Sequence, residues 1–325
     1  MIALVTGGAG FIGSHLAEAL CRRGARVRVL DNLSQGRVEN LAWRRSGDAV
    51  ELIEADLNDE PRLRQAVQGC EWVFHEAAAV SVPWSVAEPF QSNAVNLDGT
   101  LRCLVAAQAA GVKRFLFASS SAIYGDSDVP AKHEGLPPNP LSPYGLQKYA
   151  GEQYLRLFHQ LYGLATVSLR YFNVFGPRQA FNSPYSGVIA RFCTTLLAGE
   201  RPTIFGDGGQ SRDFIYVENV VAANLLAAEA PAARAAGRVF NVGGGQSITL
   251  LELAAELRRL TRPELTPWFA PARAGDVRAS LAEITAARQA LGYDVRVPWQ
   301  AGLERTLAFY RGSATGGLPR GGPAG

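Results

Sequence analysis

The chain has 325 residues, of which 47% are hydrophobic, so it is long enough for one large or two moderate domains with a buried core. Its formal net charge of +3 at pH 7 is small and dispersed, which argues against nucleic acid as a partner. No apolar run approaches the roughly 20 residues that span a bilayer, and the N-terminus has the pattern of a strand and not of a signal peptide. The four cysteines show neither a metal-ligand spacing nor a disulfide framework. We therefore expect a cytoplasmic protein without a metal, a membrane or a nucleic-acid partner.

Apolar strand patterns alternate with helical patterns along the first half of the chain. Strands are predicted at residues 2–5, 26–30, 50–54, 72–75, 114–118 and 165–170. The helices between them are predicted at residues 14–23, 60–68, 89–110 and 144–162. This alternation predicts an α/β fold with a doubly wound parallel sheet (Rossmann), in which ligands bind at the carboxyl ends of the strands.

After residue 172 the regular alternation stops, and Gly and Pro residues cluster. Helical patterns at 188–197, 217–229 and 249–260 alternate there with short strand candidates, which predicts a second, smaller α/β domain over the cleft. We expect a first domain at 1–172 that holds the parallel sheet, to which 213–242 returns, and a second domain at 173–312. The Gly- and Pro-rich residues 313–325 are predicted to be a disordered tail.

The first strand runs directly into Thr6-Gly7-Gly8-Ala9-Gly10-Phe11-Ile12-Gly13, and a helical pattern follows. Strand, glycine turn and helix in this order are typical of a dinucleotide site. The first glycine permits the tight turn, the second lets the backbone approach a pyrophosphate, and the third lets the helix pack on the strand. The helix N-terminus then offers free N–H groups to the phosphates. An ordinary strand-turn-helix corner is the alternative explanation for the glycines taken alone.

The second strand ends at Asp31, 18 residues after Gly13. A carboxylate at this position accepts hydrogen bonds from both ribose hydroxyls of an adenosine and repels a 2′-phosphate, so Asp31 favours NAD over NADP. Arg37 instead favours NADP, because an arginine can accommodate that phosphate. The structural alternative for Asp31 is a turn residue that opens the loop 31–34.

Tyr144 and Lys148 lie four residues apart at the start of the predicted helix 144–162, so both face the same side. A free tyrosine has a pKa of about 10 and is a poor base at neutral pH. A neighbouring ammonium, together with a cationic nicotinamide, would lower that pKa. Tyr144 is therefore the candidate general base, and Ser121, after the fifth strand, is the candidate donor to the same substrate oxygen. Tyr124 is a second candidate base, but no lysine follows it four residues later.

These motifs together resemble the extended short-chain dehydrogenase/reductases over about residues 1–310. The resemblance rests on the glycine turn, on the stretch 119–125 and on Tyr144-x-x-x-Lys148. Within this family the sequence is similar to the UDP-glucose 4-epimerase group, whose substrate motifs match Arg170-Tyr171-Phe172-Asn173, Arg212-Asp213-Phe214 and Arg273-x-Gly275-Asp276. The resemblance implies a tightly held NAD, a UDP-sugar substrate and a homodimer formed through the helices at 89–110 and 144–162.

The resemblance also implies a set of cofactor contacts. Asp56 and Leu57 would touch the adenine, Phe172 would touch the nicotinamide, and Lys148 would hold the nicotinamide ribose. Ala77, Ala78 and Ala79 are small enough to let a loop pass close to the cofactor. The full set of expected cofactor residues is Gly7, Gly10, Phe11, Ile12, Gly13, Asp31, Asn32, Ser34, Gly36, Asp56, Leu57, Ala77, Ala78, Ala79, Asn96, Ser119, Tyr144, Lys148 and Phe172.

For the substrate, the resemblance assigns Asn173, Arg212 and Arg273 to the diphosphate and Asp276 to the uridine-side ribose. Arginine suits a diphosphate, because its planar guanidinium can donate two parallel hydrogen bonds. The full set of expected substrate residues is Ser121, Tyr144, Asn173, Val188, Thr203, Phe205, Arg212, Arg273, Asp276 and Ser280.

Two departures separate this chain from relatives with other activities. Nucleotide-sugar 4,6-dehydratases of the family carry Asp-Glu directly after the catalytic hydroxyl residue, and with Ser121 in that role those places hold Ala122 and Ile123. The related decarboxylases carry a Glu near there, which is also missing. Uronate 4-epimerases place Thr where Asn173 stands and an Arg where this chain has Ala180. We therefore expect a 4-epimerase of UDP-hexoses.

The position seven residues after the Arg of Arg-x-Gly-Asp lines the family's pocket near the 2-substituent of the sugar. In this chain that position is Ser280. A serine leaves room for an N-acetyl group that a tyrosine would exclude, so the N-acetylated UDP-sugars are expected substrates as well. The alternative is that Ser280 only begins the loop before a helix at 283–291, and that residues 81–84 shape the pocket.

Two other classes of protein share parts of this pattern. A dehydratase, a net dehydrogenase or a 4-keto-reductase would use the same catalytic residues, and a net dehydrogenase or a reductase would release its cofactor in each turnover. A non-catalytic NAD(H)-sensing protein would keep the glycine turn but would need no Tyr144/Lys148 pair, so the intact pair favours an enzyme. The choice between UDP and dTDP, and the physiological sugar, stay open.

Overall fold

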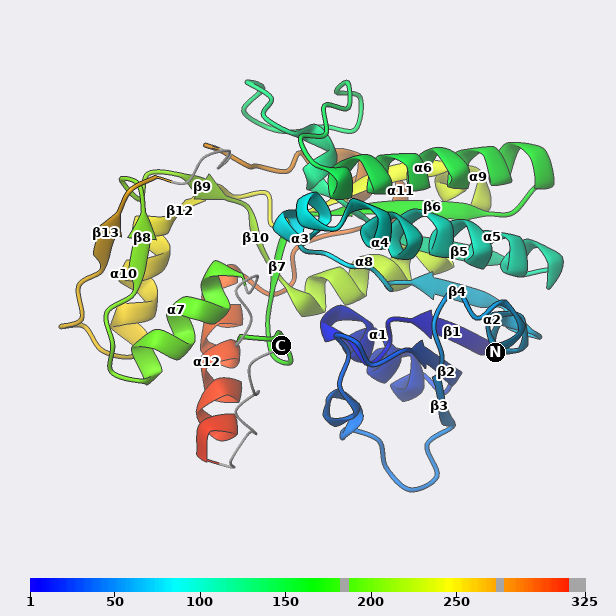
Figure 1. The fold of residues 1–325 in the computed structure, drawn as a ribbon, viewed down its shortest axis with the longest axis horizontal. Helices are drawn as coiled ribbons and strands as arrows, with labels where there is room; N and C mark the ends of the chain where they lie inside the picture. The colour runs from blue at the N-terminus through cyan, green and yellow to red at the C-terminus, as the bar shows by residue number, and fades with distance from the viewer. Residues whose placement is uncertain (182–186, 273–277, 316–325) are drawn as a thin grey trace.

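A seven-stranded sheet forms the centre of the computed structural model, which describes residues 1–181, 187–272 and 278–315 (Figure 1). The strand order is β11-β6-β5-β4-β1-β2-β3. Every neighbouring pair is parallel, so the predicted doubly wound sheet is confirmed. The strands are β1 Ile2–Thr6, β2 Arg26–Asp31, β3 Val50–Glu54, β4 Trp72–His75, β5 Arg114–Ser120, β6 Thr166–Tyr171 and β11 Arg238–Val242.

Both faces of this sheet are buried under helices. Leu4 and Val5 are neighbours on β1 and are both fully buried, yet they belong to two separate apolar clusters. Successive strand side chains point to opposite faces, so a continuous apolar run is what a sheet covered on both sides requires. One face packs against α1 Phe11–Arg22 and α8 Val217–Glu229, and the other against α2 Glu60–Val67, α5 Gly99–Ala109 and α6 Pro143–Tyr162.

The helical segment before β5 has more breaks than the single predicted helix at 89–110. It consists of α3 Val82–Ala87, which the sequence pattern did not reveal, then α4 Pro89–Asn93, a π-helical turn at Ala94–Asp98, and α5. π-helical turns concentrate at functional sites, because the extra residue redirects a side chain. Here the turn carries Asn96, whose side chain accepts a hydrogen bond from the Ala79 N–H (2.8 Å) and donates one to the Ala79 carbonyl (3.0 Å).

The second half of the chain builds a smaller lobe beside the carboxyl edge of the sheet, on the left in Figure 1. Its apolar core joins the helices α7 Val188–Leu197, α10 Leu250–Leu260 and α12 Trp299–Thr315. Thr249 caps α10 in a reciprocal capping box with Glu252, which explains why the helix begins one residue after the predicted start. Two short strand pairs complete the lobe: β8 Thr203–Phe205 with β13 Trp268–Ala270, and β9 Ser211–Arg212 with β12 Ile248–Thr249.

The chain passes between the two parts more than once. After β6 it leaves the main sheet for β7 Asn173–Phe175, which pairs with β10 Phe214–Tyr216 in a sheet of its own. It then returns through α8, and β11 joins the edge of the main sheet beside β6. α8 packs on the main sheet and β11 pairs with it, whereas β10 pairs with β7 and not with the main sheet; the division of the chain into two domains stays a prediction.

The last part of the chain adds α9 Ala232–Ala235 and α11 Thr285–Leu291, which pack near β11, and 3-10 turns occur earlier at Val38–Leu41 and Ser121–Tyr124. α12 continues to Thr315, three residues into the segment 313–325 for which the sequence predicts disorder. Residues 316–325 lie outside the described residues. Within the described ranges, no helix combines the length and the apolar character that crossing a membrane would require.

Candidate active site

The glycine turn between β1 and α1 lies in tight contact with the loop that follows β4. Gly7 has a φ of +65°, and a Cβ atom on it would lie 2.7 Å from the Cα of Ala77. A Cβ on Gly13 would lie 2.2 Å from the Gly7 carbonyl oxygen, so only glycine lets α1 start this close to the turn. Gly10 is the N-cap of α1 and provides no side-chain cap. The first amides of the helix are therefore left for an anion.

Asp31 ends β2 beside this turn, and its carboxylate is largely buried. One oxygen accepts the Ala9 N–H (2.9 Å) and the other accepts the Leu33 N–H (2.9 Å). A carboxylate offers about four acceptor positions, so acceptor capacity remains for a ribose hydroxyl. A Cβ on Gly36 would lie 2.6 Å from the Asp31 carboxylate, so a glycine is required where the loop passes over it. Burial raises the pKa of Asp31, and backbone hydrogen bonds from Leu33, Ala9 and Gly10 oppose that shift.

The neighbouring residues that the sequence assigns to the adenine side also converge. The Asn32 amide donates to Asp56 (2.7 Å), and Ser34 donates to the Asn32 side-chain oxygen through both its N–H and its hydroxyl. Leu57 is buried against Gly99 of α5, where a Cβ would lie 3.0 Å from the leucine side chain. The ends of β2 and β3 and the start of α5 are therefore brought together at the carboxyl edge of the sheet.

A buried amide network connects the loop 77–79 to the helix that carries the catalytic candidates. The Gln147 side-chain oxygen of α6 accepts hydrogen bonds from Asn96 (2.9 Å) and from Ser92 (2.8 Å). All three side chains are almost completely buried. Asn96 was a predicted cofactor residue, whereas Gln147 and Ser92 were not predicted, because a lone Gln or Ser on a helix carries no distinctive signal. The network fixes the loop 77–79 relative to Gln147, the residue preceding Lys148.

Tyr144 and Lys148 both lie in the first turns of α6, on its buried side. Ser142 caps the helix through the Gly145 N–H, and Pro143 occupies the first helical position. The Tyr144 N–H donates to the Ser85 hydroxyl of α3 (3.2 Å), so the unpredicted helix α3 anchors the first turn of α6. The predicted co-facial arrangement of the pair is therefore present.

The Lys148 ammonium is buried at the carboxyl edge of β5. Its Nζ donates to the Ala118 carbonyl (2.7 Å) and lies 4.8 Å from the centre of the Phe117 ring and 5.9 Å from the centre of the Tyr144 ring. Burial lowers the pKa of Lys148 to about 8, and the charges of Glu76 and Glu152 oppose that shift. Burial raises the pKa of Tyr144 to about 12, with a hydrogen bond to Ser120 opposing it. In the protein alone, burial therefore outweighs the expected lowering of the tyrosine pKa by the lysine.

The serine run after β5 differs from the prediction by one residue. The hydroxyl that meets Tyr144 is that of Ser120, the last residue of β5, and not that of the predicted Ser121, which begins the following 3-10 turn. Ser120 also accepts the Ala122 N–H (3.1 Å). Ser119, a predicted cofactor residue, points the other way and donates to the buried Glu152 (2.5 Å). Alternation along the strand explains this, because neighbouring side chains face opposite sides.

Glu152 in turn forms a bidentate ion pair with Arg170, at 2.8 and 2.7 Å, with both side chains almost completely buried. The Arg170 guanidinium lies 4.7 Å from the centre of the Tyr124 ring, and the Tyr124 hydroxyl donates to Asn241 (2.7 Å). Burial raises the pKa of Tyr124 to about 12. Tyr124 is therefore a buried structural residue in this arrangement, which leaves Tyr144 as the base candidate in the cleft.

The dehydratases carry Asp-Glu directly after the catalytic hydroxyl residue. With Ser120 in that role, the two positions to compare shift by one residue. The two residues after Ser120 are Ser121 and Ala122, and not Ala122 and Ile123. Neither of them carries a carboxyl group, so the reason for excluding a dehydratase is unchanged. One proton at a substrate hydroxyl can be held and moved by Tyr144, Lys148 and Ser120. None of these three residues can serve as an acid or base at a second, adjacent carbon atom.

One carboxyl group in the cleft was not predicted. Glu76 directly follows β4 and accepts a hydrogen bond from the Tyr171 hydroxyl (2.8 Å), which also accepts one from the Asn224 amide (2.7 Å). Burial raises the pKa of Glu76 to about 7, and the charge of Lys148 and the hydrogen bond from Tyr171 oppose the rise. The sequence contained a signal for Glu76, the same one that revealed Asp31. Both are carboxyl residues at the carboxyl end of a buried parallel strand.

The substrate candidates lie where β7, β9 and the segment before α11 meet. Asn173 pairs with β10, and its side chain donates to the Asp213 carbonyl (3.3 Å). The buried Asp213 carboxylate accepts the N–H groups of Gly244, Gly245 and Ala282, so it fixes the backbone on both sides of Arg212. The predicted residues Val188, Thr203 and Phe205 lie at the start of α7 and on β8.

Ser280 is half-buried, and its N–H donates to the Ser211 carbonyl (3.2 Å), next to Arg212. The expected serine is thus brought beside the expected diphosphate arginine. Arg273 and Asp276 lie outside the described residues.

Residues 3–243 match the sequence model of the NAD dependent epimerase/dehydratase family. This chain belongs to that family. A UDP-glucose 4-epimerase from Mycolicibacterium smegmatis is 39% identical over 313 residues, which cover 96% of this chain and 99% of the relative. A UDP-glucose 4-epimerase from Thermotoga maritima, solved with UDP-glucose, superimposes with a TM-score of 0.91 at 41% identity, covering 97% of this chain and all of that one (100%). A UDP-N-acetylglucosamine 4-epimerase from Methanobrevibacter ruminantium, solved with UDP-N-acetylmuramic acid, superimposes with a TM-score of 0.90 at 39% identity. The match covers 96% of this chain and 98% of that one.

The residues present fit the NAD of this epimerase/dehydratase family. Backbone contacts at Gly7 and Gly13 admit no side chain in the turn, and Asp31 keeps acceptor capacity for the adenosine ribose. The buried Lys148 ammonium has three donors and the structure gives it one hydrogen-bond acceptor, the Ala118 carbonyl. Two donors therefore remain for ribose hydroxyls, as the family resemblance implies.

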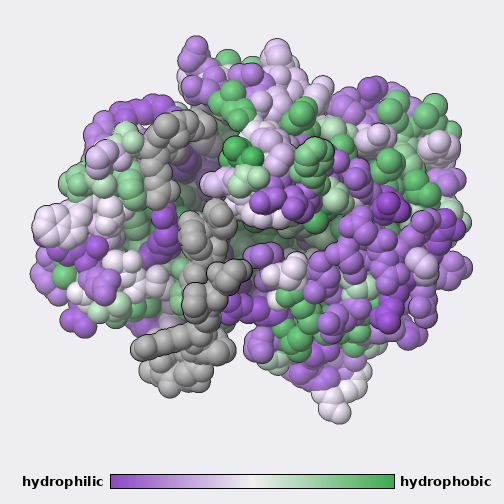
Figure 2. Space-filling model, in the orientation of Figure 1, coloured by the Kyte–Doolittle hydropathy of each residue, from purple (hydrophilic) through white to green (hydrophobic). Residues whose placement is uncertain are grey.

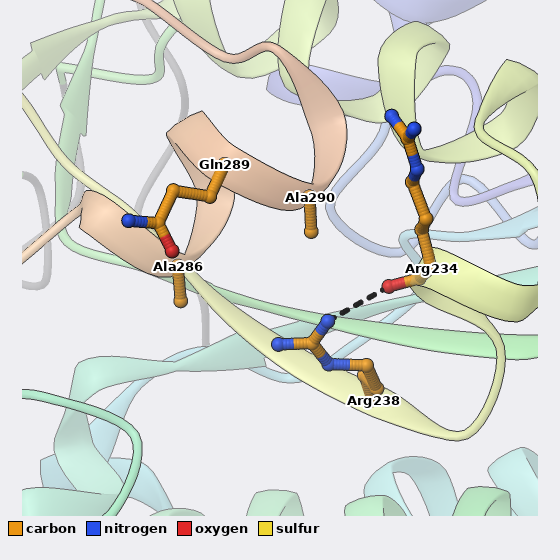
Figure 3. A pocket seen from close by; sticks show the side chains of 5 residues that line it. All are labelled: Arg234, Arg238, Ala286, Gln289 and Ala290. Carbon is orange, nitrogen blue, oxygen red and sulfur yellow. Dashed lines mark hydrogen bonds between the residues drawn. The ribbon is translucent and has the colours of Figure 1, made fainter.

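A cavity of about 260 Å³ lies away from this family site, at the amino end of β11 (Figure 3). Arg238 donates to the Arg234 carbonyl (2.9 Å), while the Arg234 side chain points away from it, so the two guanidinium groups do not converge on one ligand. Over the described ranges, no cluster of three or more His, Cys, Asp or Glu side chains is arranged to hold a metal ion. The chemistry therefore concentrates at the carboxyl edge of the sheet.

Proposed function

We propose that this protein is an NAD-dependent 4-epimerase of UDP-hexoses. The observation that carries the proposal is Tyr144, whose hydroxyl meets Ser120 and which lies one helical turn before the buried ammonium of Lys148. The three groups lie at the carboxyl edge of the sheet, where the fold binds its ligands. The names of the similar epimerases support the same activity.

The proposed mechanism uses one proton-transfer group. Tyr144 takes the proton of the sugar 4-hydroxyl and returns it after the ketone is reduced again, while the Ser120 hydroxyl donates to the same oxygen. Lys148 provides the positive charge that helps the tyrosine to act as a base, together with the cationic nicotinamide. Bound NAD supplies the reversible acceptor for the hydride from C4.

Arg212 and Asn173 hold the diphosphate while the sugar turns its other face to the cleft. Asp213 supports this role, because it locks the backbone next to Arg212 through three buried hydrogen bonds. The diphosphate therefore serves as the fixed point and the sugar as the moving part. Arg273 and Asp276 belong to the same proposal from their sequence motif alone.

The N-acetylated pair of UDP-sugars belongs to the proposed substrate range. Ser280 stands beside Arg212 and carries a small side chain where a tyrosine would fill the pocket. The 39% identical UDP-N-acetylglucosamine 4-epimerase supports this range. We include UDP-glucose, UDP-galactose and their N-acetylated counterparts.

A homodimer through the helices α4 to α6 is part of the proposal. Large apolar side chains gather over this region, where green patches appear in the upper right of Figure 2. Apolar patches of this kind mark protein–protein interfaces. The exposed side chains are those of Val86, Phe90, Val105, Leu146, Leu157 and Leu161. A cytoplasmic location fits the four cysteines, none of which forms a disulfide.

The test is product analysis with the purified protein and UDP-glucose, followed by NMR. We expect conversion to UDP-galactose until equilibrium is reached from either side, without added NAD. Acid-released nucleotide from the purified protein is expected to be NAD. Accumulation of a 4-keto-6-deoxy sugar, or a requirement for one added NAD per product, would contradict the proposal and favour a dehydratase or a net oxidoreductase.

A further inference from the structure

Asn241 of β11 has a completely buried side chain whose amide is used on both its oxygen and its nitrogen. It lies beside Arg170 of β6 in the main sheet. Its side-chain oxygen accepts the Tyr124 hydroxyl (2.7 Å), and its NH2 group donates to the carbonyls of Lys132 (2.8 Å) and Glu283 (3.0 Å). A carbonyl can only accept, so these partners determine the orientation of the amide. The loop after β5 and the segment before α11 therefore meet at one buried side chain.

Tyr124 connects Asn241 to the serine that meets the candidate base. It is the last residue of the 3-10 turn that Ser120 caps, and residues 120–124 are called the Ser120 turn below. The Arg170 guanidinium lies 4.7 Å from the centre of the Tyr124 ring, while the hydroxyl donates to Asn241. The ring and the hydroxyl are thus both held, which fixes the far end of the Ser120 turn.

Residues 279–283, called the Ser280 segment below, lie on the other side of the Asn241 amide. The Ser280 N–H donates to a carbonyl of β9 (3.2 Å). Lys132 forms a parallel bridge to the same segment, and its carbonyl accepts the Glu283 N–H (2.9 Å). That Lys132 carbonyl also accepts the Asn241 amide, so Asn241 supports the bridge from its buried side.

Asp213 holds the same segment from the direction of the expected diphosphate site. Its carboxylate accepts the Ala282 N–H (3.0 Å), and Asp213 directly follows Arg212. The Ser280 segment therefore has two buried polar anchors. Asp213 fixes it relative to Arg212, and Asn241 fixes it relative to the Ser120 turn.

We propose that Asn241 is a positioning residue that holds the Ser280 segment at a fixed place relative to the Ser120 turn, and so sets the space for the sugar. The hydroxyl that meets Tyr144 stands at one end of this link, and the expected wall of the sugar pocket stands at the other. A buried polar network whose members are all satisfied keeps them in one arrangement. The inference rests on the proposed function for the sugar, whereas the link itself can be measured without a substrate.

Hydrogen exchange of the NAD-saturated protein measures the link directly, because the Lys132 and Glu283 amides both belong to the bridge. Asn241→Asp keeps the size of the side chain and the acceptor for Tyr124 but replaces the NH2 group by an oxygen. Local opening is separable from global unfolding in this measurement, so the amides of β1 serve as the internal reference. We expect the protection factors of the two bridge amides to fall about tenfold relative to those of β1.

Tyr124→Phe removes the hydroxyl at the opposite end of the link, and it decides the question if Asn241→Asp does not fold. It should lower the protection of the Lys132 and Glu283 amides relative to β1 by a smaller factor, about threefold. Tyr310→Phe is the matched control. It removes a buried hydroxyl that donates to the Gln179 carbonyl (3.0 Å), so it should leave the relative protection of both bridge amides unchanged.

The consequence for the sugar is measured by calorimetric titration of the same NAD-saturated proteins with UDP and with UDP-N-acetylglucosamine. Asn241→Asp and Tyr124→Phe should weaken the binding of the UDP-sugar by about fivefold and leave that of UDP within about twofold. The reason is that UDP has no sugar to meet the Ser280 segment. A variant that is merely less stable would change both affinities alike.

Unchanged relative protection of the bridge amides in Tyr124→Phe, or an equal loss in Tyr310→Phe, would overturn the link. Equal changes in the affinities for UDP and for the UDP-sugar would overturn its role in the sugar pocket. If the parent protein binds neither ligand, the proposed function fails, and hydrogen exchange still decides whether Asn241 joins the two segments.

Discussion

The two serines at the end of β5 give the sharpest test of the proposed mechanism. Ser120→Ala removes the hydroxyl that meets Tyr144, whereas Ser121→Ala removes one that begins the next turn. A buried donor to the reacting oxygen contributes roughly 10²–10³ in kcat, or about 3–4 kcal/mol of transition-state stabilisation. We therefore expect Ser120→Ala to lose about that factor and Ser121→Ala to stay within about threefold of the parent.

The structural effect of the same change is small and can be separated. Ser120 accepts the Ala122 N–H at 3.1 Å as the cap of a 3-10 turn, so its loss should lower the free energy of unfolding by about 1 kcal/mol. Initial rates of UDP-galactose formation at saturating substrate, together with urea unfolding of both variants, give the two quantities. Equal losses of kcat in the two variants, or a larger loss in Ser121→Ala, would refute the assignment of the hydroxyl.

Four further outcomes follow from the site. The protein should bind NAD far better than NADP, and Asp31→Ala should narrow that difference in titrations of cofactor-free protein; equal affinities of the parent would reject the assignment. Tyr144→Phe should keep its fold and NAD but lose a factor of roughly 10²–10⁴ in turnover, which a stopped-assay comparison checks. Glu152→Gln should lower the free energy of unfolding by about 3–5 kcal/mol, because it leaves a buried guanidinium without its counter-charge, while Glu60→Gln, in an exposed Glu–Arg pair, should change nothing measurable. Ser280→Tyr should reduce turnover of the N-acetylated sugars relative to the plain ones, and an unchanged ratio of the two would show that this position does not control the pocket.

Elements with a strong periodic pattern were predictable from the sequence. The bounds of β3, β4, α7 and α8 coincide with the prediction, because the apolar or periodic pattern of each is strong. The glycine turn and Asp31 were identified as candidates for the same reason, since chemistry at the end of a parallel strand leaves a short linear signal. The fold class and the cofactor edge of the site were therefore accessible without coordinates.

Features that depend on tertiary contacts were not accessible. Three consecutive serines contain no landmark that tells which one ends β5, and the answer came from the pairing of Ser120 with Tyr171 on β6. The segment Ala94–Asp98 has an ordinary helical pattern in the sequence. Its π-helical turn, which redirects the Asn96 side chain toward Ala79, depends on hydrogen bonds that the sequence does not show. Glu76 owes its setting to Tyr171 and Asn224, which come from distant parts of the chain.

The path of the chain between the two parts limits how the protein can be divided. A fragment that ends near residue 172 would lack β11 and α8, although it would contain the six strands predicted between residues 2 and 170. β6, whose residues are all buried, would become an exposed edge with unpaired backbone groups and an apolar surface. Such a fragment should aggregate. Exchange of the sugar-binding part between relatives must therefore transfer at least two separate stretches of sequence and keep α8 and β11 with the host.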